Sequence, residues 1–214
     1  MELADYSVLK RVVFDDVYEP AEDTFILIDA LEKDIELIKN LGPGICLEIG
    51  SGSGVVITSL GKVLGYPYFL CTDLNPIAAT ATKATSQSNG VPVDVITSNL
   101  VCVLEDRLKN SVDLILCNPP YAVTPSDEVG GNNTFKATSG GVKGREVIDQ
   151  ILHIVPKLLS EKGMFYLTCI AQNDIDDISQ CMKAHNLQMT KVLERRCGIE
   201  RLCTLRFSYK NYEL

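Results

Sequence analysis

The sequence has little of what several classes of metalloprotein depend on. Its 214 residues include only two histidines and no tryptophan, and none of the eight cysteines forms a C-x-x-C pair. Structural zinc sites are usually built from such pairs, so we predict no metal site. Four cysteines lie in apolar, strand-like runs, where cysteine packs as a small core residue: Cys46, Cys71, Cys117 and Cys169. This usage favours a reducing compartment.

The chain also lacks long apolar runs and an excess of basic charge. No run is long enough to cross a bilayer, and residues 1–6 show no basic segment followed by an apolar one. We therefore expect no membrane span or signal peptide, and a cytoplasmic location with the nucleus as the second option. A net charge of −8 argues against general affinity for phosphate backbones. We interpret five basic residues near the C-terminus as solvated faces of edge strands: Lys191, Arg195, Arg196, Arg201 and Arg206.

Composition and periodicity indicate one α/β domain. Hydrophobic residues make up 46% of the chain and charged residues 22%, as in globular proteins. We assign residues 1–17 to an N-terminal extension and residues 18–214 to a single domain. Apolar strand-like runs alternate with helical segments, which predicts a parallel sheet with right-handed crossovers. The predicted strands are 45–49, 68–73, 93–96, 112–117 and 163–170, followed by a hairpin of 191–196 and 201–209. The predicted helices are 22–40, 55–64, 75–89, 145–159 and 174–185.

The motif Asn118-Pro119-Pro120-Tyr121 directly follows a strand that is apolar throughout. Two prolines stiffen this turn, which falls at the carboxyl end of a parallel strand, where ligands bind. An amide or exocyclic amine is a poor nucleophile and must be held with its lone pair toward the electrophile. The side-chain oxygen of Asn118 and the carbonyl of Pro119 can accept its two hydrogens, while Tyr121 offers a flat face. The competing interpretation is an ordinary strand-ending turn.

A glycine-rich turn and two acids precede this motif. Glu48 lies in the buried strand 45–49, just ahead of the run Gly50-Ser51-Gly52-Ser53-Gly54, and Asp73 ends the next strand. Strand, glycine turn and helix open a nucleotide-binding fold, and an acid about twenty residues later suits ribose hydroxyls. The G-x-G-x-G spacing differs from the dinucleotide fingerprint. Glu48 would repel a pyrophosphate but could receive a cationic ligand.

Two further segments carry weaker signals. Acidic residues and a proline at positions 18–24 precede an apolar-periodic run, which is typical of a helix start. Glu22, Asp23 and Thr24 are read either as a helix cap or as part of a site. Residues 122–145 form a long irregular segment after the Asn-Pro-Pro-Tyr turn. We interpret that segment as a substrate lid, the alternative being a disordered insertion.

Taken in order, these motifs resemble class I S-adenosylmethionine-dependent methyltransferases that act on planar amino nitrogens. The closer resemblance is to the HemK family of protein glutamine methyltransferases. Within that family, two segments resemble the short eukaryotic and archaeal branch that methylates class 1 translation release factors. They are Tyr18-Glu19-Pro20-Ala21-Glu22-Asp23-Thr24 and Gly141-x-x-Gly144-Arg145-Glu146-Val147.

This resemblance implies a seven-stranded sheet whose last strand is antiparallel, with S-adenosylmethionine as methyl donor and S-adenosylhomocysteine as product. It implies a cofactor site formed by Asp23, Thr24, Glu48, Gly50, Gly52, Asp73, Leu74, Asn99 and Asn118. It places catalysis on Asn118, Pro119 and Tyr121, and the substrate amide on the whole Asn118–Tyr121 motif. Asn99 stands where family members often carry an acid, and Thr138 where an aromatic residue is common. These departures predict weaker adenine binding and put the lid's substrate contact in question.

Other functions share parts of this pattern. The same turn grips the exocyclic amine of adenine, so a nucleic-acid adenine-N6 methyltransferase is the first alternative. That enzyme would need a basic groove and a way to unstack a base. Methylation of other protein side chains is a second alternative. A scaffold that has lost the chemistry is a third, which the retained Glu48, Asp73 and Asn118 argue against.

The sequence further predicts a partner subunit. In the family's strand order, residues 93–96 lie at an edge of the sheet, guarded only by Pro92 and Asp94. Apolar residues next to this edge would leave an uncovered patch: Val91, Val93, Val95, Ile96, Val101, Cys102, Val103 and Leu104. The resemblance implies that a small zinc-binding activator subunit, shared by several methyltransferases, covers it.

Overall fold

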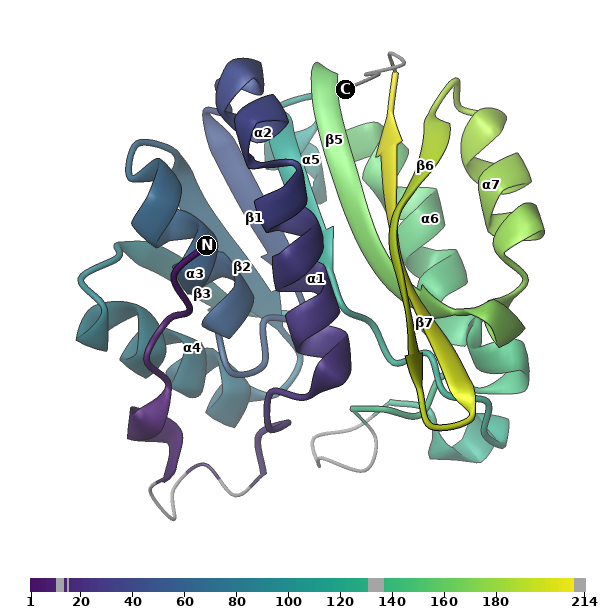
Figure 1. Cartoon of the computed structure of the whole chain (residues 1–214), viewed down its shortest axis with the longest axis horizontal. Coiled ribbons are helices and arrows are strands. Elements are labelled where there is room, and N and C mark those ends of the chain that lie inside the picture. The colour runs from purple at the N-terminus through teal and green to yellow at the C-terminus, as the bar shows by residue number, and fades with distance from the viewer. Residues whose placement is uncertain (11–13, 15, 131–136, 210–214) are drawn as a thin grey trace.

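A mixed β-sheet organises the chain, as the computed structural model of residues 1–10, 14, 16–130 and 137–209 shows (Figure 1). Its seven strands run in the order β3-β2-β1-β4-β5-β7-β6. They are β1 (Ile45–Ile49), β2 (Tyr68–Asp73), β3 (Val93–Thr97), β4 (Val112–Cys117), β5 (Leu159–Ile170), β6 (Gln188–Cys197) and β7 (Glu200–Ser208). β7 runs antiparallel to both of its neighbours, β5 and β6, and the other neighbouring strands pair in parallel. The predicted topology, including the antiparallel last strand, is confirmed.

Helices cover both faces of the sheet (Figure 1). One face carries α1 (Glu22–Lys33), α2 (Ile35–Leu41), α3 (Val55–Leu64) and α4 (Pro76–Ser88). The other carries α5 (Glu105–Leu108), α6 (Glu146–Leu158) and α7 (Ile175–Lys183). Successive residues of a strand face opposite sides, so Leu114 and Leu116 pack under α1 and α3, while Ile115 and Cys117 pack against α6. This burial on both faces explains why the β4 sequence is apolar throughout.

The strand order reverses between β1 and β4, which form a parallel pair. In open α/β sheets a crevice forms at such a switch point, outside the carboxyl ends of the strands. The glycine turn follows β1, Asp73 ends β2, and the Asn118 turn follows β4. The fold therefore gathers the three predicted motifs at one edge of the sheet.

The predicted helix 22–40 is wrong in one respect, because it is two helices that meet at Asp34. The Asp34 side chain is buried and accepts hydrogen bonds from Arg206 at 2.6 Å and from Tyr166 at 2.8 Å. The inward-facing carboxylate makes this junction part of the core. Arg206 is likewise only 2% exposed, so its expected position on a solvated face is also wrong.

Four smaller features differ from expectation or extend it. The short helix α5 was not predicted, and β5 begins four residues before the expected start, beside a register shift against β4. The N-terminal extension contacts the domain, where the backbone N–H of Ala4 donates to Ser59 and that of Asp5 to Asn89. Two 3-10 turns lie in the predicted lid, Ser126–Glu128 and Val142–Gly144. Residues 131–136 of that segment fall outside the described residues.

Across the described ranges, no helix combines the length and apolar character that crossing a bilayer would need.

Candidate active site

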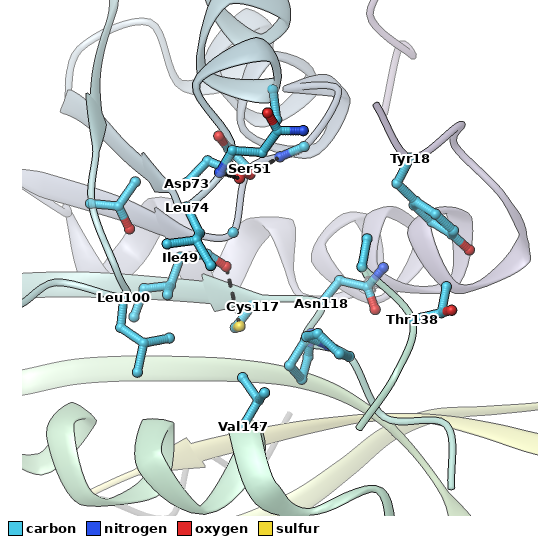
Figure 2. A pocket seen from close by; sticks show the side chains of 18 of the residues that line it. Tyr18, Ile49, Ser51, Asp73, Leu74, Leu100, Cys117, Asn118, Thr138 and Val147 are labelled. Carbon is cyan, nitrogen blue, oxygen red and sulfur yellow. Dashed lines mark hydrogen bonds between the residues drawn. The ribbon is translucent and has the colours of Figure 1, made fainter. Parts of the chain in front are cut away.

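A cavity of about 530 Å³ opens at the carboxyl ends of β1, β2 and β4. All the residues predicted for the site line it: Asp23, Thr24, Glu48, Gly50, Gly52, Asp73, Leu74, Asn99, Asn118, Pro119, Pro120 and Tyr121. Figure 2 shows Asp73 and Leu74 toward one end of this cavity and Tyr18 and Thr138 toward the other, with Asn118 between them. The cavity thus has an end at the glycine turn and an end at the Asn-Pro-Pro-Tyr turn.

The glycine turn forms the wall of the first end. Gly50 and Gly52 have φ angles of 75° and 52°, a left-handed conformation that favours glycine. The backbone N–H groups of Gly52 and Asn75 each donate to the Asp73 carboxylate at 2.8 Å. Burial raises the pKa of Asp73, and these two donors oppose that rise. Asp73 therefore fixes the turn and still faces the cavity.

Glu48 lies beneath the same end of the cavity. Its side chain is 2% exposed and accepts a hydrogen bond from the backbone N–H of Ile57, in the first turn of α3. Burial raises the pKa of Glu48 to about 8, with Asp73 adding to the rise and the Ile57 N–H opposing it. A cation bound next to Glu48 would lower that pKa, because it favours the ionised form.

At the second end, the Asn118 side chain has a defined orientation. Its Nδ2 donates a hydrogen bond to Asp23 Oδ2 at 3.0 Å. Because a carboxylate oxygen accepts hydrogen bonds, this contact fixes which end of the Asn118 amide faces Asp23. The opposite atom, Asn118 Oδ1, is buried and has no hydrogen-bond partner among the described residues. A buried acceptor without a donor is costly, so this atom fits an NH₂ group presented by a substrate.

Asn173 supports this site without lining the cavity, and the sequence did not predict that role. It is fully buried, and its Nδ2 donates to the backbone oxygens of Tyr121 at 2.8 Å and Lys143 at 2.9 Å. At Gly144, with φ 66°, an added Cβ would lie 1.9 Å from the Tyr121 oxygen. The turn is therefore held from behind by close backbone packing. The only signal in the sequence was that Asn173 follows the fifth predicted strand.

The charge of the cavity is of one sign. Five carboxylate side chains line it: Asp16, Asp23, Glu48, Asp73 and Glu200. None of its described lining residues is lysine, arginine or histidine. Such a site attracts a cationic ligand and repels phosphate groups. In the described ranges, no three His, Cys, Asp or Glu side chains are grouped so that they could hold a metal ion.

Comparison with known proteins assigns the chain to a family. The family model described as "Methyltransferase small domain" matches residues 22–197. The chain belongs to this methyltransferase family. It is 46% identical over 204 residues to mouse "Methyltransferase HEMK2", covering 95% of this chain and 94% of that protein. It is 34% identical to "eRF1 methyltransferase catalytic subunit mtq2" of Schizosaccharomyces pombe, covering 94% and 92%.

A solved structure agrees with this assignment. The complex "Mtq2-Trm112" of E. cuniculi, described as responsible for methylation of the eRF1 translation termination factor, superposes with a TM-score of 0.69. Sequence identity is 26%, and the match covers 91% of this chain and 99% of that chain. The predicted HemK-family membership and class I methyltransferase fold are thus confirmed, and the chain is a methyltransferase.

Proposed function

We propose that this methyltransferase uses S-adenosylmethionine to methylate the side-chain amide nitrogen of a glutamine in a class 1 translation release factor. The observation that carries the proposal is the buried Oδ1 of Asn118, directly after β4, which has no hydrogen-bond partner in the described part of the chain. Two relatives named for methylation of eRF1 support the choice of substrate. S-adenosylhomocysteine is the second product.

The geometry suits a weak nitrogen nucleophile. The amide lone pair is delocalised, so the enzyme must orient the NH₂ and stabilise positive charge that develops on nitrogen. Asn118 Oδ1 and the Pro119 carbonyl are the two acceptors we assign to its hydrogens. Tyr121 lies next to them, with its hydroxyl donating to Asp23 at 3.2 Å. This tether fixes the ring as one wall of the substrate end.

The carboxylates at the glycine-turn end of the cavity fit the cofactor. S-adenosylmethionine carries an ammonium group and a sulfonium, which suit a cavity lined by carboxylates, and it supplies an electrophilic methyl group. We assign its ribose to Asp73, its ammonium side to Glu48, and its remaining contacts to Thr24, Gly50, Gly52, Leu74 and Asn99. At Gly50 and Gly52 an added Cβ would meet no protein atom within 4 Å, so the backbone there is open to a ligand.

An adenine-N6 activity on nucleic acid is the second candidate, because the Asn118 turn would also hold an exocyclic amine. The carboxylates that line the cavity, among them Asp16 and Glu200, oppose it because they would repel the phosphates that flank a flipped base. The test is a parallel incubation of the enzyme with labelled S-adenosylmethionine and either a class 1 release factor or adenine-containing DNA and RNA. We expect label in the release factor and none in the nucleic acids. The Asn118→Ala variant is the negative control and should label neither. Label in nucleic acid alone would overturn the proposal.

For the cofactor end, we predict that Asp73→Ala weakens S-adenosylmethionine binding by roughly 2–3 kcal/mol, as expected for hydrogen bonds to a charged group. The variant loses the acceptor for the ribose hydroxyls, and the Gly52 N–H loses its partner. Isothermal titration calorimetry measures the change. Asp106→Ala, on the short helix α5, is the control and should bind the cofactor normally. An unchanged dissociation constant for Asp73→Ala would remove Asp73 from the cofactor site.

A second prediction concerns pH. Because the pKa of Glu48 is about 8, much of the free enzyme carries a protonated Glu48 below that pH. Binding of a cation favours the ionised form, so binding releases a proton, and affinity for S-adenosylmethionine should rise with pH up to about 8. The slope should approach about tenfold per pH unit well below the pKa. In Glu48→Gln the affinity should be lower and this slope absent. Equal slopes in both proteins would contradict the role of Glu48.

We also propose that the enzyme works as a heterodimer with a small zinc-binding activator subunit, docked at the β3 edge. The E. cuniculi structure is a two-protein complex, and β3 is an edge strand of the sheet. The predicted surface needs correction, however. Four of its members are buried because they pack into the core: Val91, Val93, Val101 and Leu104. Of the other predicted residues, Val95 and Ile96 are half-buried, Cys102 is exposed and Val103 is 60% exposed. Tyr68 of β2, which donates to Asp94 of β3, was not predicted for this surface and is 51% exposed.

We therefore expect Val103→Lys to prevent heterodimer formation while leaving the melting temperature of the isolated chain unchanged. A stable interface should bury at least ~1,200 Å² in total, so a charge within it is costly. Val93→Lys is the contrasting variant: its side chain is 6% exposed and lies in the core, so this change should unfold the chain. Size-exclusion chromatography of co-expressed subunits measures the outcome. Full activity of the monomeric chain, or a Val103→Lys heterodimer, would contradict the docking model.

A further inference from the structure

The carboxylate of Asp23 lies at the first turn of α1 and bridges three side chains of the substrate end. Its Oδ2 accepts from Asn118 Nδ2 at 3.0 Å and from the Tyr121 hydroxyl at 3.2 Å. The Tyr18 hydroxyl lies 3.1 Å from each oxygen, and the backbone N–H of Thr24 donates to Oδ1 at 2.8 Å. Asp23 itself is only 5% exposed.

These contacts leave little capacity for another ligand. A carboxylate offers about four lone-pair positions, and the surrounding protein donors already use them. A cofactor group that donated to Asp23 would have to displace one of these contacts. Asp23 lines the cavity, but its carboxylate has no lone pair left to accept a hydrogen bond from the cofactor, as the predicted assignment to the cofactor would need.

We infer that Asp23 is a positioning residue that acts through Asn118. By accepting from Nδ2, it turns Asn118 Oδ1 toward the substrate and prevents the amide from flipping. By accepting from Tyr18 and Tyr121, it ties both rings around the same point. The inference rests on the proposed methyl transfer to an NH₂ group, because Asn118 Oδ1 is the atom that would receive that group.

The charge of Asp23 adds a second effect. Hydrogen bonds to an ionised acceptor are stronger than neutral ones, and linked hydrogen bonds polarise one another. The Asp23 carboxylate thus makes Asn118 Oδ1 a better acceptor. The negative charge also stabilises the positive charge that develops on the substrate nitrogen. This arrangement explains why Tyr18 and Asp23, close in sequence, meet a turn that lies 95 residues later in the chain.

Asp23→Asn tests this role because it keeps the shape and removes the charge. Its new NH₂ group lies opposite Asn118 Nδ2, and the two donors favour a flip of the Asn118 amide that turns Oδ1 toward position 23 and away from the substrate. We expect kcat for methyl transfer to fall by about 10- to 100-fold, with the dissociation constant for S-adenosylmethionine changed by less than about twofold. The neighbouring Glu22→Gln variant is the control. Glu22 lies in the same helical turn but pairs with Arg195 at the surface, so kcat should stay at the wild-type value.

A double mutant separates this role from a purely structural one. In the Asn118→Ala background, Asp23→Asn should reduce kcat much less than it does in the wild-type background, since Asp23 acts mainly through Asn118. Multiplicative losses, or a weakened cofactor affinity with kcat unchanged, would overturn the inference.

A readout without substrate keeps the inference distinct from the proposed function. The side-chain NH₂ resonances of Asn118, identified by their loss in Asn118→Ala, should shift in Asp23→Asn and stay in place in Glu22→Gln. Unshifted resonances in Asp23→Asn would overturn the inference. A wild-type enzyme that fails to methylate a release factor would instead overturn the proposed function.

Discussion

Asn118→Ala should abolish most methyl transfer while the enzyme still binds S-adenosylmethionine. The variant removes the buried Oδ1 atom that has no hydrogen-bond partner among the described residues, and it leaves the glycine turn and Asp73 untouched. Loss of one preorganised hydrogen-bonding group at a site of developing charge costs about two to three orders of magnitude in rate. Single-turnover kinetics with saturating cofactor, next to calorimetric titration of the cofactor, measure both quantities.

Asn99→Ala is the matched control, since Asn99 lines the same cavity and is assigned to the cofactor end. It should show the opposite pattern, with weaker cofactor binding and a nearly normal rate at saturation. If Asn118→Ala instead lost cofactor binding and kept its rate per bound enzyme, the assignment of the two ends of the cavity would be reversed.

The largest effect on stability is expected from Asp34→Ala. Asp34 and Arg206 form an ion pair at 2.6 Å in which the side chains are 2% and 3% exposed, and Tyr166 donates to the same oxygen. Removing the carboxylate takes away a buried partner of both the Arg206 guanidinium and the Tyr166 hydroxyl, which costs about 3–5 kcal/mol in free energy of unfolding. Urea denaturation monitored by circular dichroism measures this loss.

Asp29→Ala provides the comparison on the same helix. Asp29 pairs with Arg195 at 2.6 Å, but the side chains are 41% and 40% exposed. A solvent-exposed pair contributes about 0–1 kcal/mol, so this variant should unfold near the wild-type urea concentration. Equal losses for the two variants would show that burial of the Asp34 pair is not what makes it important.

The sequence predicted those parts of the site that depend on local pattern. An apolar run followed by Asn118-Pro119 predicts a strand and a turn by itself, and the same holds for Glu48 before the glycines and for Asp73. Parallel topology then brings these strand ends together without further information, because ligand sites lie at the carboxyl ends of such sheets. The family, the fold and the clustering of the site residues followed from these motifs.

Side-chain contacts between distant segments could not be predicted in this way. The bond from Asn118 to Asp23 and those from Asn173 to the turn join residues whose patterns, taken alone, indicate a helix cap and a strand end. The edge strand illustrates the same limit. Its position was predicted correctly, but only the packing of α3 and α4 decides that Val93 faces the core while Val103 faces outward.

The most direct test of the central claim is tandem mass spectrometry of a class 1 release factor after incubation with the enzyme, its activator subunit and S-adenosylmethionine. We expect one added methyl group on the side-chain nitrogen of a single glutamine, and no modification with Asn118→Ala enzyme. Replacing that glutamine by asparagine in the release factor should remove the signal. A methyl group on any other side chain, or transfer that persists with Asn118→Ala, would contradict the account.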